Sequence, residues 1–331
     1  MKSKLGQIIQ FVIFFGLGGG LMYWQFNGFT DEQREQFYNG LRNANYVWFV
    51  VALFIGLASH LLRAIRWQAL LTPLGHKVGL GTRLYAVMIG YLANYAFLRL
   101  GEVIRPGVLK TSDDVPMSES IGTVVVERVV DTLCLGVVFL MVLVFQFAAL
   151  KGLFVEYVWD PAIAKFGNIM GSPIKVVILV VVIAALVGGF FFLRHRVKGK
   201  AKAFFVGLKD GLMSIRKVKK PGMFILQSLL IWAGYYLALY VVFFCFPETS
   251  SLTLNSALIL LLFGTFGVAF TPGGIGAYQI IITAIMIEMA PSTEPAAASF
   301  AWLSWGTQVA TVVLFTGVAF ALRPALNKIK S

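Results

Sequence analysis

Residues 94–106 read Asn94-Tyr95-Ala96-Phe97-Leu98-Arg99-Leu100-Gly101-Glu102-Val103-Ile104-Arg105-Pro106. This stretch carries two arginines and a glutamate, yet it lies between apolar segments. A second polar group, Glu127-Arg128 with Asp131, interrupts another apolar run further along the chain. A charged residue in hydrocarbon costs on the order of 2.5 to 3.5 kcal/mol, is usually paired, and usually marks a site. The pattern predicts a charged site inside a membrane protein. The alternative is that these charges only neutralise one another and fix helix packing.

The composition is that of an integral membrane protein. Of the 331 residues, 58% are hydrophobic and only 13% are charged, and the mean hydropathy is +0.81. Soluble domains are about 45–50% apolar and about 25% charged. Because no polar stretch is long enough for a large soluble domain, we predict one transmembrane domain over residues 1–331.

The net charge of +13 is concentrated in residues 194–220. Between membrane spans, such a basic segment is typical of a cytoplasmic loop under the positive-inside rule, so we expect no binding of nucleic acid. Lysines precede the first apolar run, Leu5 to Trp24, and basic residues follow the last one. Both termini are therefore predicted to be cytoplasmic, in a multi-pass protein of the cell (inner) membrane.

Sidedness then predicts a hairpin. Full spans are expected over residues 5–24, 46–62, 121–150, 174–193, 223–246 and 296–322. Residues 150–173 lie outside in this topology, and residues 84–117 begin and end on the cytoplasmic side. The apolar part of that segment would reach about 21 Å as a helix, short of the ~30 Å hydrocarbon core. We therefore predict a re-entrant helical hairpin over 84–117.

A second hairpin is predicted over 254–290, in which Thr271-Pro272-Gly273-Gly274-Ile275-Gly276 joins two short apolar helices. The hairpins open to opposite sides, one in the first half (1–193) and one in the second half (221–331). This is the pattern of an inverted repeat. Two full spans in place of the second hairpin would leave sidedness unchanged. The predicted fold is thus all-α, with about six full spans and two re-entrant hairpins in an inverted-repeat arrangement.

The chemistry suits an anionic head group. Arginine offers a two-pronged fork for phosphate, and a glycine-rich helix start offers backbone N–H groups to an anion, although a tight bend without a ligand is equally compatible. Glu127 and Asp131, at i and i+4, share a helix face, where they would orient an arginine or carry a coupling proton. The candidate substrate-binding residues are Arg99, Glu102, Arg105, Glu127, Arg128, Asp131, Pro272, Gly273, Gly274 and Gly276. Arg63, Arg66 and Trp67, at a span end, are typical of membrane-interface anchors.

These motifs carry a family resemblance. In order they are Arg63-Ala64-Ile65-Arg66-Trp67, Arg99-Leu100-Gly101-Glu102-Val103-Ile104-Arg105, Glu127-Arg128-Val129-Val130-Asp131 and Thr271-Pro272-Gly273-Gly274-Ile275-Gly276. The chain resembles the lysylphosphatidylglycerol synthase transmembrane (flippase-like) family, also seen as the membrane part of the multiple peptide resistance factor. The resemblance implies movement of lipids or lipid-linked head groups between leaflets. It also implies no lipid aminoacylation, since the soluble synthase domain has no counterpart here.

Two positions depart from the family's pattern: Phe97 stands where a proline is common, and Gln279 stands where an acid is common. The second departure puts a proton-coupling role at that position in doubt.

The leading hypothesis is a lipid flippase or transporter without covalent chemistry, acting on an anionic phospholipid or a polyprenyl-phosphate-linked substrate. The alternatives are a membrane-embedded enzyme or accessory subunit using Glu102, Glu127 or Asp131 as acid or base, and a structural scaffold. The sequence contains no nucleotide, metal or nucleophile motif. We therefore expect no catalytic residue, cofactor or metal. Membrane lipids are the expected partners, together with a lipid-modifying enzyme.

Overall fold

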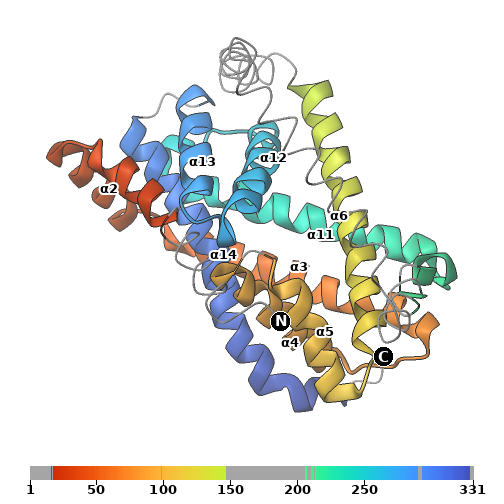
Figure 1. The fold of residues 1–331 in the computed structure, drawn as a ribbon. Helices are drawn as coiled ribbons and strands as arrows, with labels where there is room; N and C mark the ends of the chain where they lie inside the picture. Colours follow the sequence, from red (N-terminus) through yellow and green to blue (C-terminus); the bar gives the residue numbers. More distant parts are fainter. Residues whose placement is uncertain are drawn as a thin grey trace, which may run out of the picture.

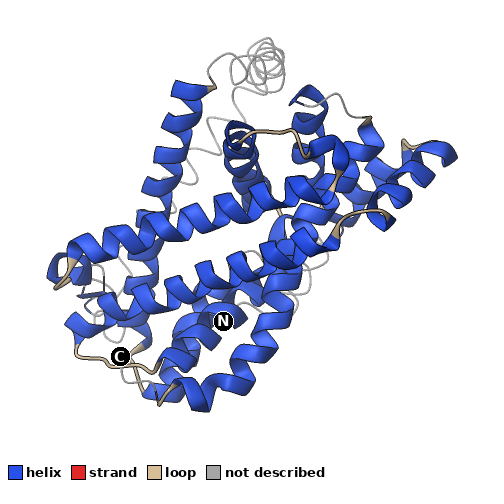
Figure 2. Ribbon diagram, turned by 180° about the vertical axis from the view of Figure 1, so that it is seen from behind, coloured by secondary structure: helices blue, strands red, loops and turns tan. Residues whose placement is uncertain are grey.

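The computed structural model describes residues 16, 18–97, 99–146, 206, 210–211, 213–289 and 293–328. All regular secondary structure in these ranges is helical (Figure 2). The predicted span 174–193, the segment 150–173, most of the basic loop 194–220 and the first part of the span 5–24 lie outside the described residues.

Among the helices of the described residues, four are long and apolar enough to cross a membrane. They are α3 (Tyr46–Leu71), α6 (Met117–Phe145), α11 (Pro221–Val242) and α14 (Glu294–Leu326). Figures 1 and 2 show α3 and α11 running beside each other, with α6 crossing α11. The predicted all-α, polytopic fold is confirmed at this level.

Helix α3 is longer than the sequence pattern predicts. It was expected to end near Leu62, but it continues to Leu71 and stops before Pro73 and Gly75. Proline cannot continue the helical hydrogen bonding, and Gly75 adopts the left-handed conformation (φ 87°) that closes the turn. The Arg-Ala-Ile-Arg-Trp motif is therefore helical and belongs to the body of α3.

The first predicted hairpin is formed by α4 (Leu80–Ala96) and α5 (Gly101–Asp113). The two helices approach closely at a pair of glycines: a Cβ on Gly101 would lie 2.0 Å from the carbonyl oxygen of Gly90. Any side chain at this contact would separate the helices. Helix α4 packs against α14 and α5 packs against α6.

The second predicted hairpin is formed by α12 (Leu254–Phe270), the short helix η6 (Pro272–Gly274) and α13 (Ala277–Met289). Gly273, Gly274 and Gly276 all have positive φ, between 60° and 79°. Non-glycine residues rarely adopt this conformation, which explains why the turn is glycine-rich. The loop lies beside the end of α4, so the tips of the two hairpins meet.

The remaining described helices connect these elements. Helix α2 (Asp31–Arg42) begins with a capping box between Thr30 and Gln33 and packs on α14. The short helices are η1 (Thr72–Leu74), η3 (Ser214–Lys217), η4 (Phe243–Cys245) and η5 (Pro247–Thr249). One apolar core joins α11, α12, α13 and α14, and a second joins α3, α4, α5 and α6. The polar groups described next lie beside the second core.

Candidate functional site

Three helices bring seven charged residues together. They are Arg63 and Arg66 of α3, Glu102 and Arg105 of α5, and Glu127, Arg128 and Asp131 of α6. We call this set the charged network. The sequence analysis singled out six charged residues, in the stretch 94–106 and in the group 127–131. Five of them belong to the network, and the sixth, Arg99, does not.

The inner part of the network consists of short, buried ion pairs. Arg105 Nη2 lies 2.6 Å from Glu127 Oε2, and Arg63 Nη1 lies 2.7 Å from Asp131 Oδ2. Arg66 Nη2 lies between the two acids, 3.3 Å from Asp131 Oδ1 and 3.6 Å from Glu127 Oε1. Because Glu127 and Asp131 are one turn apart on α6, one helix face holds all three arginines.

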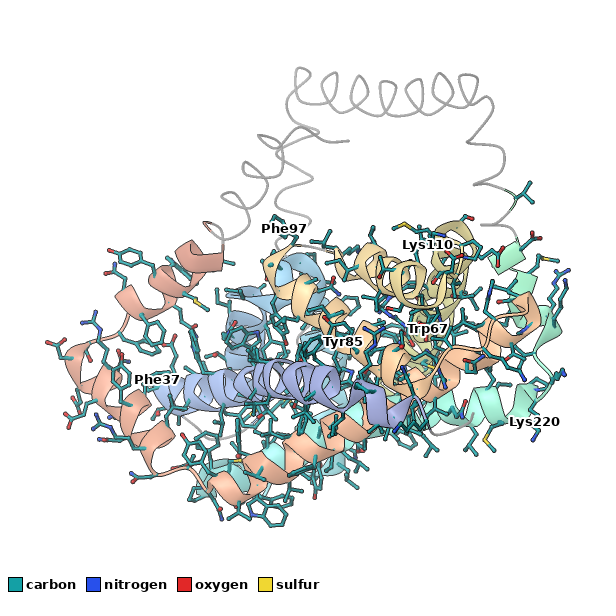
Figure 3. The ribbon with its side chains drawn as sticks, turned by 90° about the horizontal axis from the view of Figure 1, so that it is seen from below. Phe37, Trp67, Tyr85, Phe97, Lys110 and Lys220 are labelled. Carbon is teal, nitrogen blue, oxygen red and sulfur yellow. The ribbon has the colours of Figure 1, made fainter. Side chains whose placement is uncertain are left out.

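Arg105 is held by packing as well as by charge. Its guanidinium carbon lies 4.3 Å from the centroid of the Trp67 ring, within the range of a cation–π interaction. The Trp67 Nε1–H group donates to Thr123 Oγ1 at 2.9 Å, which fixes the ring. Gly90 leaves room for the arginine, since a Cβ there would lie 2.5 Å from Arg105 Cγ. Figure 3 shows Trp67 inside the helix bundle.

The arginines of the network are not fully satisfied. Four arginines face three carboxylates, so the network carries one excess positive charge when all are ionised. Arg105 is 1% exposed, and its Nε and Nη1 atoms have no hydrogen-bond partner among the described residues; the same holds for Arg66 Nε. A buried donor without a partner costs about 1–3 kcal/mol, and more when it is charged. An anion is the group that would satisfy these donors.

The outer edge of the network is looser than its centre. Arg128 Nε lies 3.4 Å from Glu102 Oε1 and Arg128 Nη1 lies 3.5 Å from Asp131 Oδ2. The side chains of Arg128 and Glu102 are each 34% exposed. Arg99 lies just before Glu102, at the start of α5, is exposed, and adopts a left-handed conformation with φ 59°. This conformation is uncommon for a residue other than glycine.

Three polar residues that sequence reasoning did not select complete the site. Tyr235 Oη accepts from Arg63 Nη2 at 3.3 Å, Ser228 Oγ accepts from Arg66 Nη1 at 2.7 Å, and Tyr91 Oη lies 3.5 Å from Tyr235 Oη. Serine and tyrosine are common within apolar helices, so the sequence offers no signal that separates these residues from others. Their role depends on the packing of α4 and α11 against α3.

Arg63, Arg66 and Trp67 require a correction. As interface anchors, their side chains would be exposed at the membrane surface, but each is at most 2% exposed. The longer α3 helix carries them into the protein, where both arginines join the network. The motif is therefore part of the candidate site.

The glycine turn contacts the first hairpin at Tyr95, which is not a member of the charged network. Gly273 packs on Tyr95, and its carbonyl oxygen accepts from Trp305 Nε1 at 2.8 Å. The N–H of Gly274 donates to the Thr271 carbonyl, and that of Gly276 donates to Gln279 Oε1 at 2.8 Å. These groups are thus engaged within the turn. The contacts of the described residues connect the turn to α4 and α14, and Pro272 is buried there.

The described residues include no group of three His, Cys, Asp or Glu side chains placed to hold a metal ion. Arg83 is buried, but its described partners are backbone carbonyls of α3 and of the loop before α4.

Comparison with known proteins agrees with this architecture. Neither the curated proteins nor the solved structures contain a match to the chain. One family model, described as the lysylphosphatidylglycerol synthase TM region, matches residues 7–317 and thus nearly the whole chain. This range includes α3, α6 and α11, most of α14, and the charged network. The chain is therefore a membrane protein and belongs to the lysylphosphatidylglycerol synthase TM region family.

Proposed function

We propose that this protein moves a lipid with an anionic head group between the leaflets of the cell membrane, and that the charged network binds that head group. The observation that carries the proposal is the buried arginine surplus: Arg105 and Arg66 have donors without partners among the described residues, and the network holds one more cation than it has acids. A phosphate would accept from those donors and balance the charge. An anionic phospholipid and a polyprenyl-phosphate-linked lipid share this chemistry.

The head group would reach the buried arginines through the outer edge of the network. The Arg128–Glu102 contact is the longest and most exposed link to α5. Glu102 and Arg105 are separated by one turn of that helix, so they share a face. A phosphate that displaces Glu102 from Arg128 would therefore meet Arg105 next. Arg99, exposed beside this edge, supplies a first cation for the approaching anion.

The proposed topology follows the sequence. We infer one transmembrane domain with cytoplasmic termini, a cytoplasmic loop 194–220, and re-entrant hairpins over 84–117 and 254–290. Alternating access would then come from movement of the hairpins, whose tips meet at Tyr95 and Gly273. This contact supports the arrangement, since broken helices that meet within a bundle are the usual setting of transporter sites.

Leaflet transfer in proteoliposomes tests the proposal. Purified protein is reconstituted with trace fluorescent lipids carrying anionic, zwitterionic or polyprenyl-phosphate head groups, and a membrane-impermeant reductant reports the leaflet of each. We expect faster transfer of an anionic lipid than in protein-free vesicles. Arg128→Gln should slow it, while Arg42→Gln, at an exposed position on α2, should not.

Two outcomes would contradict the proposal. Transfer no faster than in protein-free vesicles for every lipid would remove the flippase function. Normal transfer by a well-folded Arg128→Gln protein would show that lipid transfer does not depend on the charged network. Cleaved or modified lipid in the same vesicles would instead favour the membrane-embedded enzyme, with Glu102 as the accessible carboxylate.

A further inference from the structure

A groove of about 360 Å³ lies between α6 and α11. Its lining is almost entirely apolar. It comes from α6, with Leu133 and Val137, from α11, with Phe224 and Ser228, and from Ile215 of η3 and the following Val218. Both helices are long enough to cross the membrane. One turn of an α-helix, about 10 Å across and about 5.4 Å long, fills roughly 420 Å³. This exceeds the volume of the groove, so the groove suits a single flexible chain.

One end of the groove is bordered by positive charge. Four exposed basic residues lie in the same short segment as the lining residues Ile215, Val218 and Pro221: they are Arg216, Lys217, Lys219 and Lys220. We call them the basic rim. Within the described part of the chain, none of the four has an acidic partner at ion-pair distance. Lys220 lies at the outer end of α11 in Figure 3.

The groove is distinct from the charged network, although the two share a wall. Ser228 accepts a hydrogen bond from Arg66, and the Phe224 ring lies 5.4 Å from the Arg66 guanidinium. Both residues line the groove, so they separate it from Arg66, which is fully buried. A ligand in the groove would therefore contact the basic rim at one end, and Phe224 and Ser228 would separate it from the charged network.

We propose that this groove binds one acyl chain of an anionic phospholipid, with its phosphate against the basic rim. The apolar lining excludes a polar occupant, because unpartnered polar groups are costly in such surroundings. Clustered lysines and arginines beside a membrane span attract anionic lipid. The lipid is a resident one, and its binding does not depend on the proposed transport.

Lipid retention by the full chain tests this site. The protein is purified in a neutral detergent, incubated with mixed micelles of phosphatidic acid and phosphatidylcholine, and passed over gel filtration, and the lipid per chain is measured by mass spectrometry. We expect retention of phosphatidic acid over phosphatidylcholine. Inorganic phosphate at equal concentration should not displace it, because phosphate lacks the acyl chain.

Four variants separate the groove from other surfaces. Val137→Trp fills the groove and should abolish retention, whereas Leu140→Trp, exposed on α6 outside the groove, should not. Lys217→Gln combined with Lys220→Gln should weaken binding of phosphatidic acid by about 30-fold. Arg42→Gln combined with Lys328→Gln removes the same charge elsewhere and should leave binding unchanged.

The result can overturn the proposal in three ways. Equal retention of both lipids by the wild type would exclude the basic rim as an anion site. Retention by Val137→Trp equal to that by Leu140→Trp would exclude the groove. If Arg128→Gln loses retention as completely as the rim variant, the lipid lies in the charged network instead. Because the rim residues are exposed, the rim variant should fold even if Val137→Trp does not.

Discussion

Arg105 and Glu127 form a fully buried ion pair that joins α5 to α6, with Nη2 and Oε2 2.6 Å apart. The arginine is 1% exposed and the glutamate is completely buried. Water cannot stabilise either charge if the other is removed. The pair is therefore a sensitive test of whether the network serves stability, binding, or both.

Removing one member of this pair should destabilise the protein strongly. We expect Glu127→Leu to cost about 3–5 kcal/mol of unfolding free energy, because Arg105 is left buried and unpaired. The double variant Glu127→Leu with Arg105→Met should recover much of that loss, since neither charge remains. Thermal unfolding in detergent measures both. If the double variant is no more stable than Glu127→Leu, the pair is not the source of the loss.

Arg105→Lys should separate binding from folding. Lysine keeps the positive charge beside Glu127 but loses the planar fork and the stacking on Trp67. We expect a folded yield close to wild type and a transfer rate of anionic lipid reduced by roughly tenfold, consistent with about 1.4 kcal/mol of lost binding. Arg42→Lys, on the exposed face of α2, is the matched control. A transfer loss that only follows the loss of folded protein would favour the scaffold hypothesis.

Glu102→Gln should strengthen capture of an anionic head group. The substitution removes the acid that competes for Arg128, while both side chains remain one-third exposed. Exposed ion pairs contribute about 0.2–1 kcal/mol, so the gain should be no more than about fivefold in affinity. Titration with a fluorescent anionic lipid measures it. Weaker binding by Glu102→Gln would mean that the carboxylate contacts the substrate directly.

Gly273→Ala should disrupt the meeting point of the hairpins. Gly273 has φ 60°, and a Cβ there would lie 1.9 Å from Tyr95 Cδ1. Backbone strain and the clash together should lower stability by more than about 1 kcal/mol. Gly306→Ala is the control, because a Cβ at this position of α14 has nothing within 4 Å, and it should be neutral or stabilising. Equal melting temperatures for the two variants would contradict the packing.

Cysteine labelling should report the proposed topology. We expect cysteines replacing Asp114 and Lys219 to react with an impermeant thiol reagent from the cytoplasmic side, and a cysteine replacing Ser250 to react from the outside. All three positions are exposed, and both native cysteines are buried. Asp114 and Lys219 on opposite sides would rule out the re-entrant hairpin over 84–117.

Local patterns in the sequence predicted the four long described helices and the break before α13, but not the end of α3. Helix α13 (Ala277–Met289) is one of the two short apolar helices predicted within 254–290, and the glycine turn before it has the positive φ angles that its composition indicates. Each of the four long described helices overlaps its predicted apolar run over most of its length. Hydropathy and helix-breaking residues act over a few helical turns. Helices and the breaks between them can therefore be predicted without knowledge of the tertiary structure.

The charge pairing, in contrast, depends on residues far apart in the sequence. Arg63 and Arg66 were expected at the membrane surface, yet the extended α3 buries them against α6, whereas Arg99 was expected in the site and is exposed. The partners Ser228 and Tyr235 come from α11, more than 160 residues beyond Arg63 and Arg66. Which charges meet is decided by helix length, rotation and packing, and these are fixed only when α3, α5, α6 and α11 come together.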